Sequence, residues 1–315
     1  MTRTDAKNAL GVVAVLVAGA LATTLGARAT NEATTVRSGT TEASVRDATG
    51  ARVPIRPYHR IVSGSLVADR LLLELAEPER VLAYSTYVES SSAVAHRHAG
   101  TPSVDLSGDL EALLSMRPDL VFASNFVDPA KVARLRQAGI AVFDLGPMYG
   151  VATLLPNIRQ MGAVLGCPER GEALARAFET RLASVADDVP PARRPSGIYL
   201  GIHASQVYGG TRGSSFHDVI EAAGLVDVAA TRYRGWPSLT SEQVLALDPD
   251  YVITQQGKAT LLCRHAGLSV LRACRTPGRL VEVDDRILND PGLAMLDAAE
   301  AIRLAVHGPP GGRGP

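Results

Sequence analysis

The feature that most constrains this fold is a phrase that occurs twice. "DLEALLSMRPDLVFAS" covers residues 109–124, and "TSEQVLALDPDYVIT" covers residues 240–254. In both, a Glu opens a stretch of apolar residues at helical spacing, Pro-Asp follows, and a short β-rich run comes next. Pro ends a helix and favours extended backbone in the residue before it. We therefore expect two equivalent helix–strand units, one in each half of the chain.

Strands and helices alternate around both units. We expect strands at 60–64, 80–85, 120–124, 140–146, 197–203, 251–255 and 279–285, and helices at 66–77, 110–117, 129–139, 214–224, 240–247, 268–274 and 291–306. A β-hairpin is expected at 44–55, with Asp47 and Gly50 marking its turn. Strands that alternate with helices predict a parallel sheet covered on both faces.

The segment 151–189 has no strand signal, and its apolar residues recur at three and four. It is expected to be helical, with a kink or restart at Gly166-Cys167-Pro168. The predicted fold class is therefore α/β, with two lobes (44–150 and 190–308), each a mainly parallel sheet flanked by helices, bridged by one long helix at 151–189. Such lobes leave a cleft between them, and ligands bind at domain interfaces and at the carboxyl ends of parallel strands.

The two ends of the chain are expected to lie outside the fold. Basic residues precede a long apolar run, and Ala27-Arg28-Ala29 is a small-residue cleavage site, so residues 1–29 are interpreted as a secretory signal peptide. The alternative is an uncleaved membrane anchor, because the run is nearly long enough to cross a bilayer. Residues 30–43 are interpreted as a flexible tether, and 309–315 as a disordered tail. The predicted location is the periplasm, or outside the cell, after cleavage.

Charge and cysteine content limit the possible partners and compartments. The formal net charge is +0, which gives no electrostatic reason to expect nucleic acid. Only three cysteines are present, so disulfides are not the main source of stability. Cys263 and Cys274 can pair in an oxidising compartment, which leaves Cys167 over; three buried thiols are the alternative.

Common catalytic motifs are missing from the sequence. "GGTRGSSF" at 209–216 has no Lys before its Ser pair and lacks Walker spacing, Gly-x-Ser-x-Gly does not occur, and neither H-E-x-x-H nor a paired C-x-x-C is present. In "SSFHD", Ser215, His217 and Asp218 would face different ways on a helix, which argues against a catalytic triad. We therefore expect that the protein is not an enzyme.

His96 and His98 are the best metal-like pair. On an extended loop, side chains at i and i+2 share a face, so both imidazoles could reach one metal ion or haem. Two solvated loop histidines are the interpretation that we favour. The pair is nevertheless the basis of an alternative function, a metal-dependent, hydrolase-like enzyme in the same cleft, although no acidic partner lies nearby in the sequence.

Aromatic residues make up only 4% of the chain, so their placement is informative. Most follow predicted strands or lie in loops: Tyr84, Tyr87, Tyr149, Tyr208, Tyr233 and Trp236. Tyr and Trp combine a flat apolar area with a polar tip, which suits a large planar ligand. The alternative for each is packing within a loop. We favour binding for Trp236 and packing for Tyr84.

Several of these segments, taken in order, resemble a known family. "SVRDATGARVPI", "RIVSGS", "DLEALLSMRPDLVFAS", the long helix, "GSSFHDVIEAAG" and "GWPSLTSEQVLALDPDYVI" are similar to the periplasmic solute-binding proteins of ABC importers for cobalamin, iron–siderophores and haem. The resemblance covers about Ser44 to His307. It implies two lobes on one long helix, limited hinge motion, and a ligand held in the cleft by loop aromatics and polar groups. The "WPxxxxEQVLA" pattern at Trp236–Ala246 looks especially like the cobalamin-binding members.

The resemblance also implies which residues bind the ligand. By position in the loops these are Tyr87, Tyr149, Tyr208, Arg212, Trp236, Ser63 and Asn125. The Arg212 guanidinium could meet a carboxylate or phosphate of the ligand; a solvated loop charge is the alternative. No intrinsic cofactor is expected, and the ligand would be a metal-containing complex: cobalamin, a ferric siderophore or haem. His96 and His98 in the first cleft loop, and the lack of a dense Arg cluster, depart from the family pattern.

The motif repeated at 109–124 and 240–254 has two explanations, one from helix capping and one from the family resemblance. Asp109 and Thr240 can cap their helices, and Glu111 and Glu242 then lie in the first turn, where the helix dipole favours a carboxylate. In cobalamin-type receptors, a Glu at this point in each lobe docks on permease arginines. The resemblance therefore implies that Glu111 and Glu242 contact an inner-membrane ABC permease. The protein itself is expected to be a monomer.

Overall fold

The computed structural model describes residues 43–88, 94–108 and 110–309, all within the compact unit 42–315. The predicted signal peptide, almost all of the predicted tether, the proposed helix cap Asp109, and all but the first residue of the predicted tail lie outside the described residues. Within the described ranges, no helix is both long enough and apolar enough to cross a membrane.

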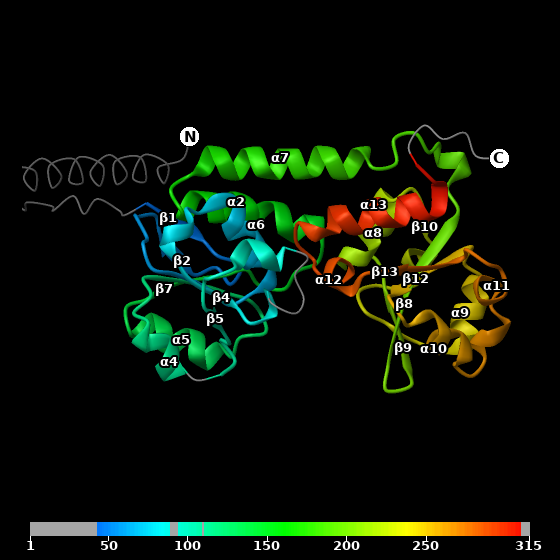
Figure 1. The fold of residues 1–315 in the computed structure, drawn as a ribbon, viewed down its shortest axis with the longest axis horizontal. Helices are drawn as coiled ribbons and strands as arrows, with labels where there is room; N and C mark the ends of the chain where they lie inside the picture. Colours follow the sequence, from blue (N-terminus) through cyan, green and yellow to red (C-terminus); the bar gives the residue numbers. More distant parts are fainter. Residues whose placement is uncertain (1–42, 89–93, 109, 310–315) are drawn as a thin grey trace, which may run out of the picture. The chain divides into compact units, whose positions relative to one another are not determined.

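The N-terminal lobe contains a parallel sheet with strand order β5-β4-β3-β6-β7 (Figure 1). Its strands are β3 (Ile61–Ser63), β4 (Val81–Ser85), β5 (Ser103–Val104), β6 (Leu120–Ala123) and β7 (Ala141–Asp144), and its helices are α2 (Leu66–Leu75), η1 (Pro78–Arg80), η2 (Ala95–His98), α4 (Leu110–Ser115) and α5 (Pro129–Gln137). The expected hairpin is β1 (Ser44–Arg46) with β2 (Arg52–Pro54). Because β4 and β6 lie on opposite sides of β3, the carboxyl ends of β3 and β6 form a topological switch point.

The C-terminal lobe has the order β11-β9-β8-β12-β13, with β10 also paired to β8. Its elements are η3 (Pro191–Arg193), β8 (Ser196–His203), β9 (Gln206–Gly210), α8 (Ser215–Ala222), β10 (Val226–Asp227), η4 (Val228–Thr231), β11 (Ser238–Leu239), α9 (Ser241–Leu247), β12 (Tyr251–Gln255), α10 (Ala259–Arg264), η5 (Leu268–Val270), α11 (Arg272–Arg275), β13 (Leu280–Val283), α12 (Asp285–Leu288) and α13 (Ala294–His307). Strands β8, β10, β12 and β13 pair in parallel, whereas β9 and β11 are antiparallel. The predicted fold class, two mainly parallel sheets flanked by helices, is confirmed.

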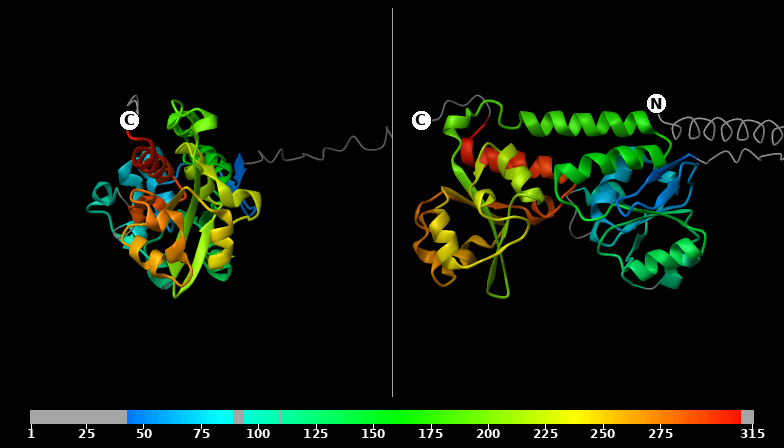
Figure 2. Two further views of the ribbon diagram at one scale, coloured as in Figure 1. Left: turned by 90° about the vertical axis from the view of Figure 1, so that its right-hand side faces the viewer. Right: turned by 180° about the vertical axis from the view of Figure 1, so that it is seen from behind.

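The helical segment after residue 150 is two helices rather than one. They are α6 (Val151–Val164) and α7 (Pro168–Ser184), separated by Gly166 in the left-handed region, so the expected restart occurs. They run one beside the other (Figure 2), and a Cβ built on Gly162 would come within 2.8 Å of the Gly171 Cα. Helix α7 contacts α2 of the N-terminal lobe and α8 and α13 of the C-terminal lobe. The bridge is therefore a helical hairpin; the exact lobe boundaries stay predictions.

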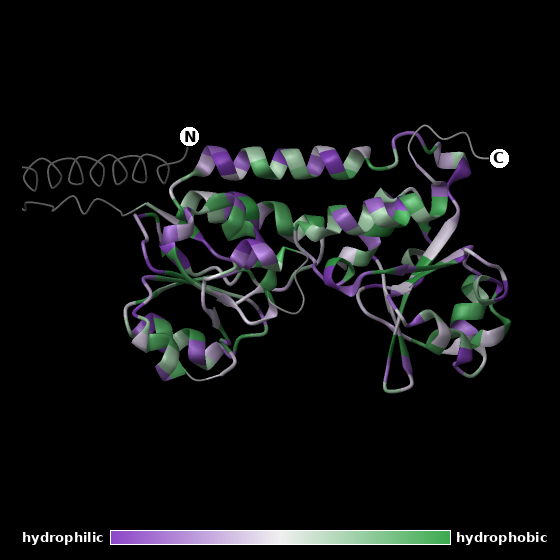
Figure 3. Ribbon diagram, in the orientation of Figure 1, coloured by the Kyte–Doolittle hydropathy of each residue, from purple (hydrophilic) through white to green (hydrophobic). Residues whose placement is uncertain are grey.

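One apolar core passes through both lobes. In β3, Ile61 faces this shared core and Val62 faces a core confined to the N-terminal lobe; in β12, Ile253 faces the shared core and Val252 a core confined to the C-terminal lobe. This alternation follows from the two-residue period of a strand. Figure 3 shows hydrophilic and hydrophobic turns alternating along α7, whose buried face adds Phe178 to the shared core.

The doubled Pro-Asp phrase anchors the central strand of each sheet. The Asp119 carboxylate accepts the backbone N–H groups of His59 and Arg60, at the entrance to β3. In the same way, the Asp250 carboxylate accepts the backbone N–H of Ser196 at the start of β8. Each Asp thus holds the strand that neighbours its own. These hydrogen bonds explain why an Asp follows the Pro in both copies of the motif, which helix capping does not explain.

The residues before the two prolines also correspond. Arg117 and Asp248 both have positive φ, 48° and 41°, which is uncommon for residues other than glycine. In each case an arginine from elsewhere donates to the carbonyl oxygen of the left-handed residue: Arg60 to Arg117, and Arg272 to Asp248. The expected Thr240 cap is confirmed as a capping box with Gln243.

An ion-pair network links the two lobes. Arg70 of α2 lies 3.3 Å from Asp290, whose side chain is fully buried, and 3.2 Å from Asp297 on α13. Burial raises the pKa of Asp290 to about 6, although Arg70 and the Gly292 N–H act in the opposite direction. The lobes are therefore joined by a desolvated charge pair as well as by the apolar core.

Candidate functional site

The N-terminal part of the candidate site lies where the parallel strands end. Tyr87 follows β4, Asn125 and Phe126 follow β6, and Tyr149 follows β7. Because the carboxyl ends of parallel strands meet at one edge of a sheet, these residues share that edge. Tyr87 and Tyr149 are each 52% exposed and Phe126 is 84% exposed. Solvent-facing rings of this size are the flat apolar surfaces expected of a binding site.

Phe126 was missed by the sequence analysis, because "SNFVDP" reads as a loop that ends in Pro. The available signal was a large apolar residue directly after the predicted Asn125 contact and directly after a buried strand. In the structure the Val127 side chain is buried in the core, whereas the Phe126 side chain is exposed to solvent. It therefore belongs with the predicted aromatic residues of this edge.

Ser63 and Asn125 differ in accessibility. Asn125 is exposed, whereas Ser63 is completely buried and donates its hydroxyl proton to the Ser65 carbonyl oxygen at 3.2 Å. On the helix that follows Ser63, the buried Asp69 carboxylate accepts the N–H and the hydroxyl of Ser85, the last residue of β4. Burial raises the pKa of Asp69 to about 6 against these hydrogen bonds. Ser63 thus faces the supporting interior in this structure and not the exposed edge.

The backbone around Tyr149 is fixed from two sides. Its own N–H donates to the Thr153 hydroxyl at 2.8 Å. The next turn begins with Val151, whose N–H donates to the Asp218 carboxylate at 2.7 Å. Asp218 belongs to α8 of the C-terminal lobe, so a residue of one lobe caps the helix that follows a candidate ligand residue of the other. Burial raises the pKa of Asp218, with the Val151 N–H opposing.

The C-terminal part of the site is built around Trp236. Trp236 is 55% exposed, and its ring stands edge-on to Phe216, with centroids 4.8 Å apart. Phe216 stacks on buried Tyr199 at 3.6 Å. A rigid aromatic base of this kind restricts Trp236 to few orientations. The Trp236 ring is therefore positioned by side chains of its own lobe.

Two backbone segments next to Trp236 are paired with each other. The Thr211 N–H donates to the Gly235 carbonyl oxygen, and the Gly235 N–H donates to the Arg212 carbonyl oxygen, at 3.0 and 2.9 Å. Arg212 is exposed, and within the described residues its guanidinium has no ion pair or hydrogen bond. Tyr208, predicted to lie in a loop, instead lies on β9 opposite Ser238 of β11 and is 36% exposed. The structure thus brings Tyr208, Arg212 and Trp236 together on adjoining segments.

A hydrogen-bond cluster around the buried Asp227 carboxylate holds the segment that carries Thr211 and Arg212. The Asp227 carboxylate accepts from the Thr211 hydroxyl at 2.6 Å and lies 2.8 Å from His217 Nδ1. The hydrogen bond to Asp227 raises the pKa of His217. The partner of His217 is therefore Asp227 and not its sequence neighbour Asp218. This arrangement positions the loop, and among the described residues no hydrogen bond joins the His217 ring to a serine, in agreement with the argument against a triad.

The predicted geometry of His96 and His98 is wrong, and so is the favoured interpretation of two solvated histidines, because His98 is buried. Residues Ala95–His98 form a 3₁₀ helix, in which positions i and i+2 do not share a face. His96 is exposed, whereas His98 is buried against the Tyr84 ring, and both of its ring nitrogens lack a partner. Burial, with Arg97 and Arg70 adding to it, lowers the pKa of His98 to about 4. Among the described residues, no group of three or more His, Cys, Asp or Glu could hold a metal ion.

Glu111 and Glu242 occupy equivalent exposed positions. Each lies in the first turn of its helix, α4 or α9, as expected from the doubled phrase. Hydrogen bonds from the backbone of Glu242 itself and from Thr240 lower the pKa of Glu242. Two pockets of about 370 Å³ lie elsewhere, between α7 and α13 and between α7 and α8. None of the predicted ligand residues lines either of these two pockets.

Comparison with known proteins now bears on this arrangement. A family model described as "Periplasmic binding protein" matches residues 61–309. The chain belongs to the periplasmic binding protein family. This is a family of binding proteins and not of enzymes, so the expectation that the protein is not an enzyme is confirmed.

Relatives within the binding proteins differ in what their names say. A cobalamin-binding protein of Halobacterium salinarum is 28% identical over 261 residues, covering 79% of this chain and 69% of the relative. An uncharacterized ABC transporter substrate-binding lipoprotein of Bacillus subtilis is 20% identical over 210 residues, covering 64% of this chain and 66% of the relative. The structure of an apo periplasmic haem-binding protein from Roseiflexus superposes with a TM-score of 0.67 at 24% identity, covering 78% of this chain and 97% of that one. That likeness shows the shared fold.

Proposed function

We propose that this binding protein captures a large, flat metal chelate of the cobalamin or haem kind and delivers it to an ABC importer. The observation that carries the proposal is the distribution of aromatic residues. Within the described residues, the exposed Phe, Tyr and Trp side chains are Tyr87, Phe126 and Tyr149, which follow parallel strands of the N-terminal sheet, and Tyr208 and Trp236, which lie on adjoining segments of the C-terminal lobe. Large exposed aromatic side chains in a soluble lobe mark an interaction surface, and flat rings match the face of a corrin or porphyrin.

Cobalamin is the ligand that we propose first. The relative named for cobalamin aligns over 79% of this chain. Arg212 offers an exposed guanidinium beside Trp236, suited to a phosphate or carboxylate at the edge of the ligand. Haem, whose propionates offer the same edge chemistry, and ferric siderophores are the alternatives within the class.

Intrinsic fluorescence gives a direct binding assay. Trp236 is the only tryptophan in the chain and lies in the candidate site, so all tryptophan emission reports on it. Cobalamin and haem absorb in the near ultraviolet, and either should quench Trp236 in a saturable way when bound. Titration with cyanocobalamin, haemin and a ferric siderophore, corrected with free tryptophan amide for absorbed light, separates the three. If none quenches, and none raises the melting temperature as a ligand of the native state must, the ligand class is wrong.

Substitutions locate the binding surface. Phe126→Ala and Tyr208→Ala should each weaken cobalamin binding by roughly tenfold, the loss expected for about 1.4 kcal/mol of aromatic contact. Leu304→Ala removes a similarly exposed apolar side chain from α13, away from the site, and is the matched control. Equal affinities in all three variants would place the ligand elsewhere on the protein.

Docking on an inner-membrane permease is proposed through Glu111 and Glu242. Their equivalent first-turn positions in the two lobes fit a partner with two equivalent halves. Reversal of both charges to Arg should abolish transport and leave ligand affinity intact. Glu169→Arg, in the first turn of α7, is the matched control. Loss of ligand affinity in the double variant would argue against a docking role.

A further inference from the structure

The hairpin that carries Tyr208 has an unfavourable turn. Strands β8 and β9 are joined by Ala204 and Ser205, which have φ values of 45° and 68°. Two-residue turns with positive φ at both positions usually contain Asn and Gly, because a Cβ is disfavoured in this region. Neither residue is present here. Such a turn persists only when contacts from outside hold it in place.

His265 supplies a contact of this kind. Its Nε2 lies 2.9 Å from the Ser205 carbonyl oxygen, and its Nδ1 lies 3.2 Å from the Ala266 carbonyl oxygen. A carbonyl oxygen only accepts hydrogen bonds and a neutral imidazole has one N–H, so the ring can make only one of these two bonds, and we assign the shorter Nε2 contact as that bond. His265 thus donates to the left-handed turn from a segment that is distant in the sequence.

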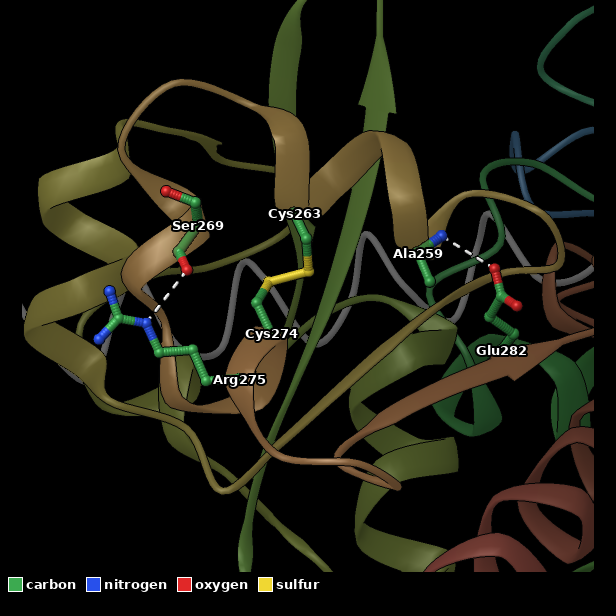
Figure 4. The surroundings of a disulfide bond; sticks show 6 residues. All are labelled: Ala259, Cys263, Ser269, Cys274, Arg275 and Glu282. Carbon is green, nitrogen blue, oxygen red and sulfur yellow. Dashed lines mark hydrogen bonds between the residues drawn. A yellow bond between two sulfur atoms is a disulfide. The ribbon is translucent and has the colours of Figure 1, made fainter.

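His265 belongs to a segment closed by a disulfide bond, residues 263–274. Cys263 and Cys274 are bonded, with their Cα atoms 5.6 Å apart (Figure 4), which is the pairing that the sequence left open. Directly after this segment, the Arg275 Nε donates to the Ser269 carbonyl oxygen inside it. Before the segment, at the start of α10, the Glu282 carboxylate accepts the Ala259 N–H. Both helices that carry the cysteines are short, so these bonds hold a segment with little regular structure of its own.

The disulfide-closed segment is also tied to α9 and to the hairpin core. The Ser241 hydroxyl donates to the Ala266 carbonyl oxygen at 2.5 Å, and Arg272 donates to the Asp248 carbonyl oxygen at 3.1 Å, so the two ends of α9 are both held. Leu268 is buried in the same core as Val207 of β9. The segment is therefore held at three points after His265, namely Ala266, Leu268 and Arg272.

We propose that His265, held by the Cys263–Cys274 disulfide, is the positioning residue for the β8–β9 hairpin and for Tyr208 on it. Tyr208 lies three residues from Ser205 and pairs with Gly201 and Ser238. Release of the turn loosens this end of the ladder and moves the Tyr208 ring. Reduction of the disulfide has the same effect through His265. The part of this inference that concerns affinity rests on the proposed function; the part that concerns the hairpin does not.

Amide hydrogen exchange of the ligand-free protein tests the structural part. His265→Ala should raise exchange at Ser205–Tyr208 by about tenfold, the change expected when one hydrogen bond is lost. His265→Gln places an amide N–H near the position of Nε2 and should restore much of the protection. Arg264→Ala, at an exposed neighbour without a described partner, is the matched control.

The disulfide is tested by a Cys263→Ser, Cys274→Ser double variant and by mild reduction of the wild type. Both should raise exchange in the same hairpin, and cobalamin affinity should fall by several-fold in each and in His265→Ala. The positioning role would be overturned if His265→Ala kept the wild-type protection from amide exchange at Ser205–Tyr208, or if His265→Gln restored none of the lost protection. A loosened hairpin with unchanged affinity would overturn its link to binding. If the hairpin responds as expected but wild type binds neither cobalamin nor haemin, the proposed function fails and the positioning role stands.

Discussion

Replacing Arg70 by methionine should destabilise the protein strongly, and more at high pH than at low pH. Methionine keeps most of the apolar stem of Arg70 and removes its charge. The Asp290 side chain is completely buried, so the substitution leaves an unpaired carboxylate in the interior. Breaking a buried pair from one side costs about 3–5 kcal/mol of the free energy of unfolding. We expect that loss at pH 8.

The pH dependence follows from the raised pKa of Asp290. Burial raises this pKa from 3.8 to about 6. A carboxyl with a higher pKa in the folded state binds protons more tightly there, so folding becomes less favourable as pH rises from 3.8 to about 6. Over this pH range, Asp290 alone lowers the free energy of unfolding by about 3 kcal/mol. Without Arg70 the pKa of Asp290 rises further, so the loss in the free energy of unfolding is larger at pH 8. The loss disappears at a pH where Asp290 is protonated in both the folded and the unfolded state.

Urea unfolding at pH 4.5, 6 and 8, followed by circular dichroism and by Trp236 emission, measures these free energies. Asp290→Asn in the Arg70→Met background removes the stranded charge and should recover most of the loss at pH 8. Arg181→Met is the matched control, because Arg181 and Glu300 form an exposed pair worth at most about 1 kcal/mol. A loss below about 1 kcal/mol for Arg70→Met at pH 8, or no recovery in the double variant, would refute the reasoning.

Three further substitutions test other parts of the structure. Gly162→Ala should cost about 1–3 kcal/mol in urea unfolding, because the new methyl group meets the Gly171 backbone; an unchanged midpoint would show that α6 and α7 can separate. His98→Phe should raise stability by about 1 kcal/mol at pH 7 by removing a buried unpartnered imidazole. Its advantage should grow as pH falls from 6.5 towards about 4, where wild-type His98 resists protonation in the folded state; a smaller advantage at pH 5 than at pH 7 would contradict this. Asp250→Asn should lower the free energy of unfolding by about 1–3 kcal/mol, because it weakens the hydrogen bonds from the Ser196 N–H and hydroxyl. If the variant is as stable as the wild type, β8 does not depend on these bonds.

The sequence predicted the parallel part of the fold well, because buried strands and amphipathic helices have clear periodicities. It missed β9, since Ala204-Ser205 has no turn signature and depends on His265 for support. It also missed β11, which has only two residues. The helix expected at 268–274 is divided into a 3₁₀ turn and a short helix at Leu271, whose backbone is extended. These are places where distant contacts override local preference.

The candidate site was predictable to the extent that its residues follow strands. The positions of Tyr87, Tyr149 and Trp236 outside the core needed only the alternation of elements. The histidine pair failed because loop conformation at 95–98 is not set by a pattern that the sequence displays. The Arg70–Asp290 pair joins residues far apart in the chain, and no local spacing predicts it.

The shared core has a consequence for how ligand leaves the protein. Its side chains run from β3 through α6 and α7 to β12, so wide separation of the lobes would place apolar surface in water. Thermal motion alone would therefore open the protein rarely, and under the proposed function a bound chelate would dissociate slowly. If the importer proposal holds, release becomes mechanical: the permease must strain the lobes apart, and the energy for unloading comes from the transporter and not from the receptor.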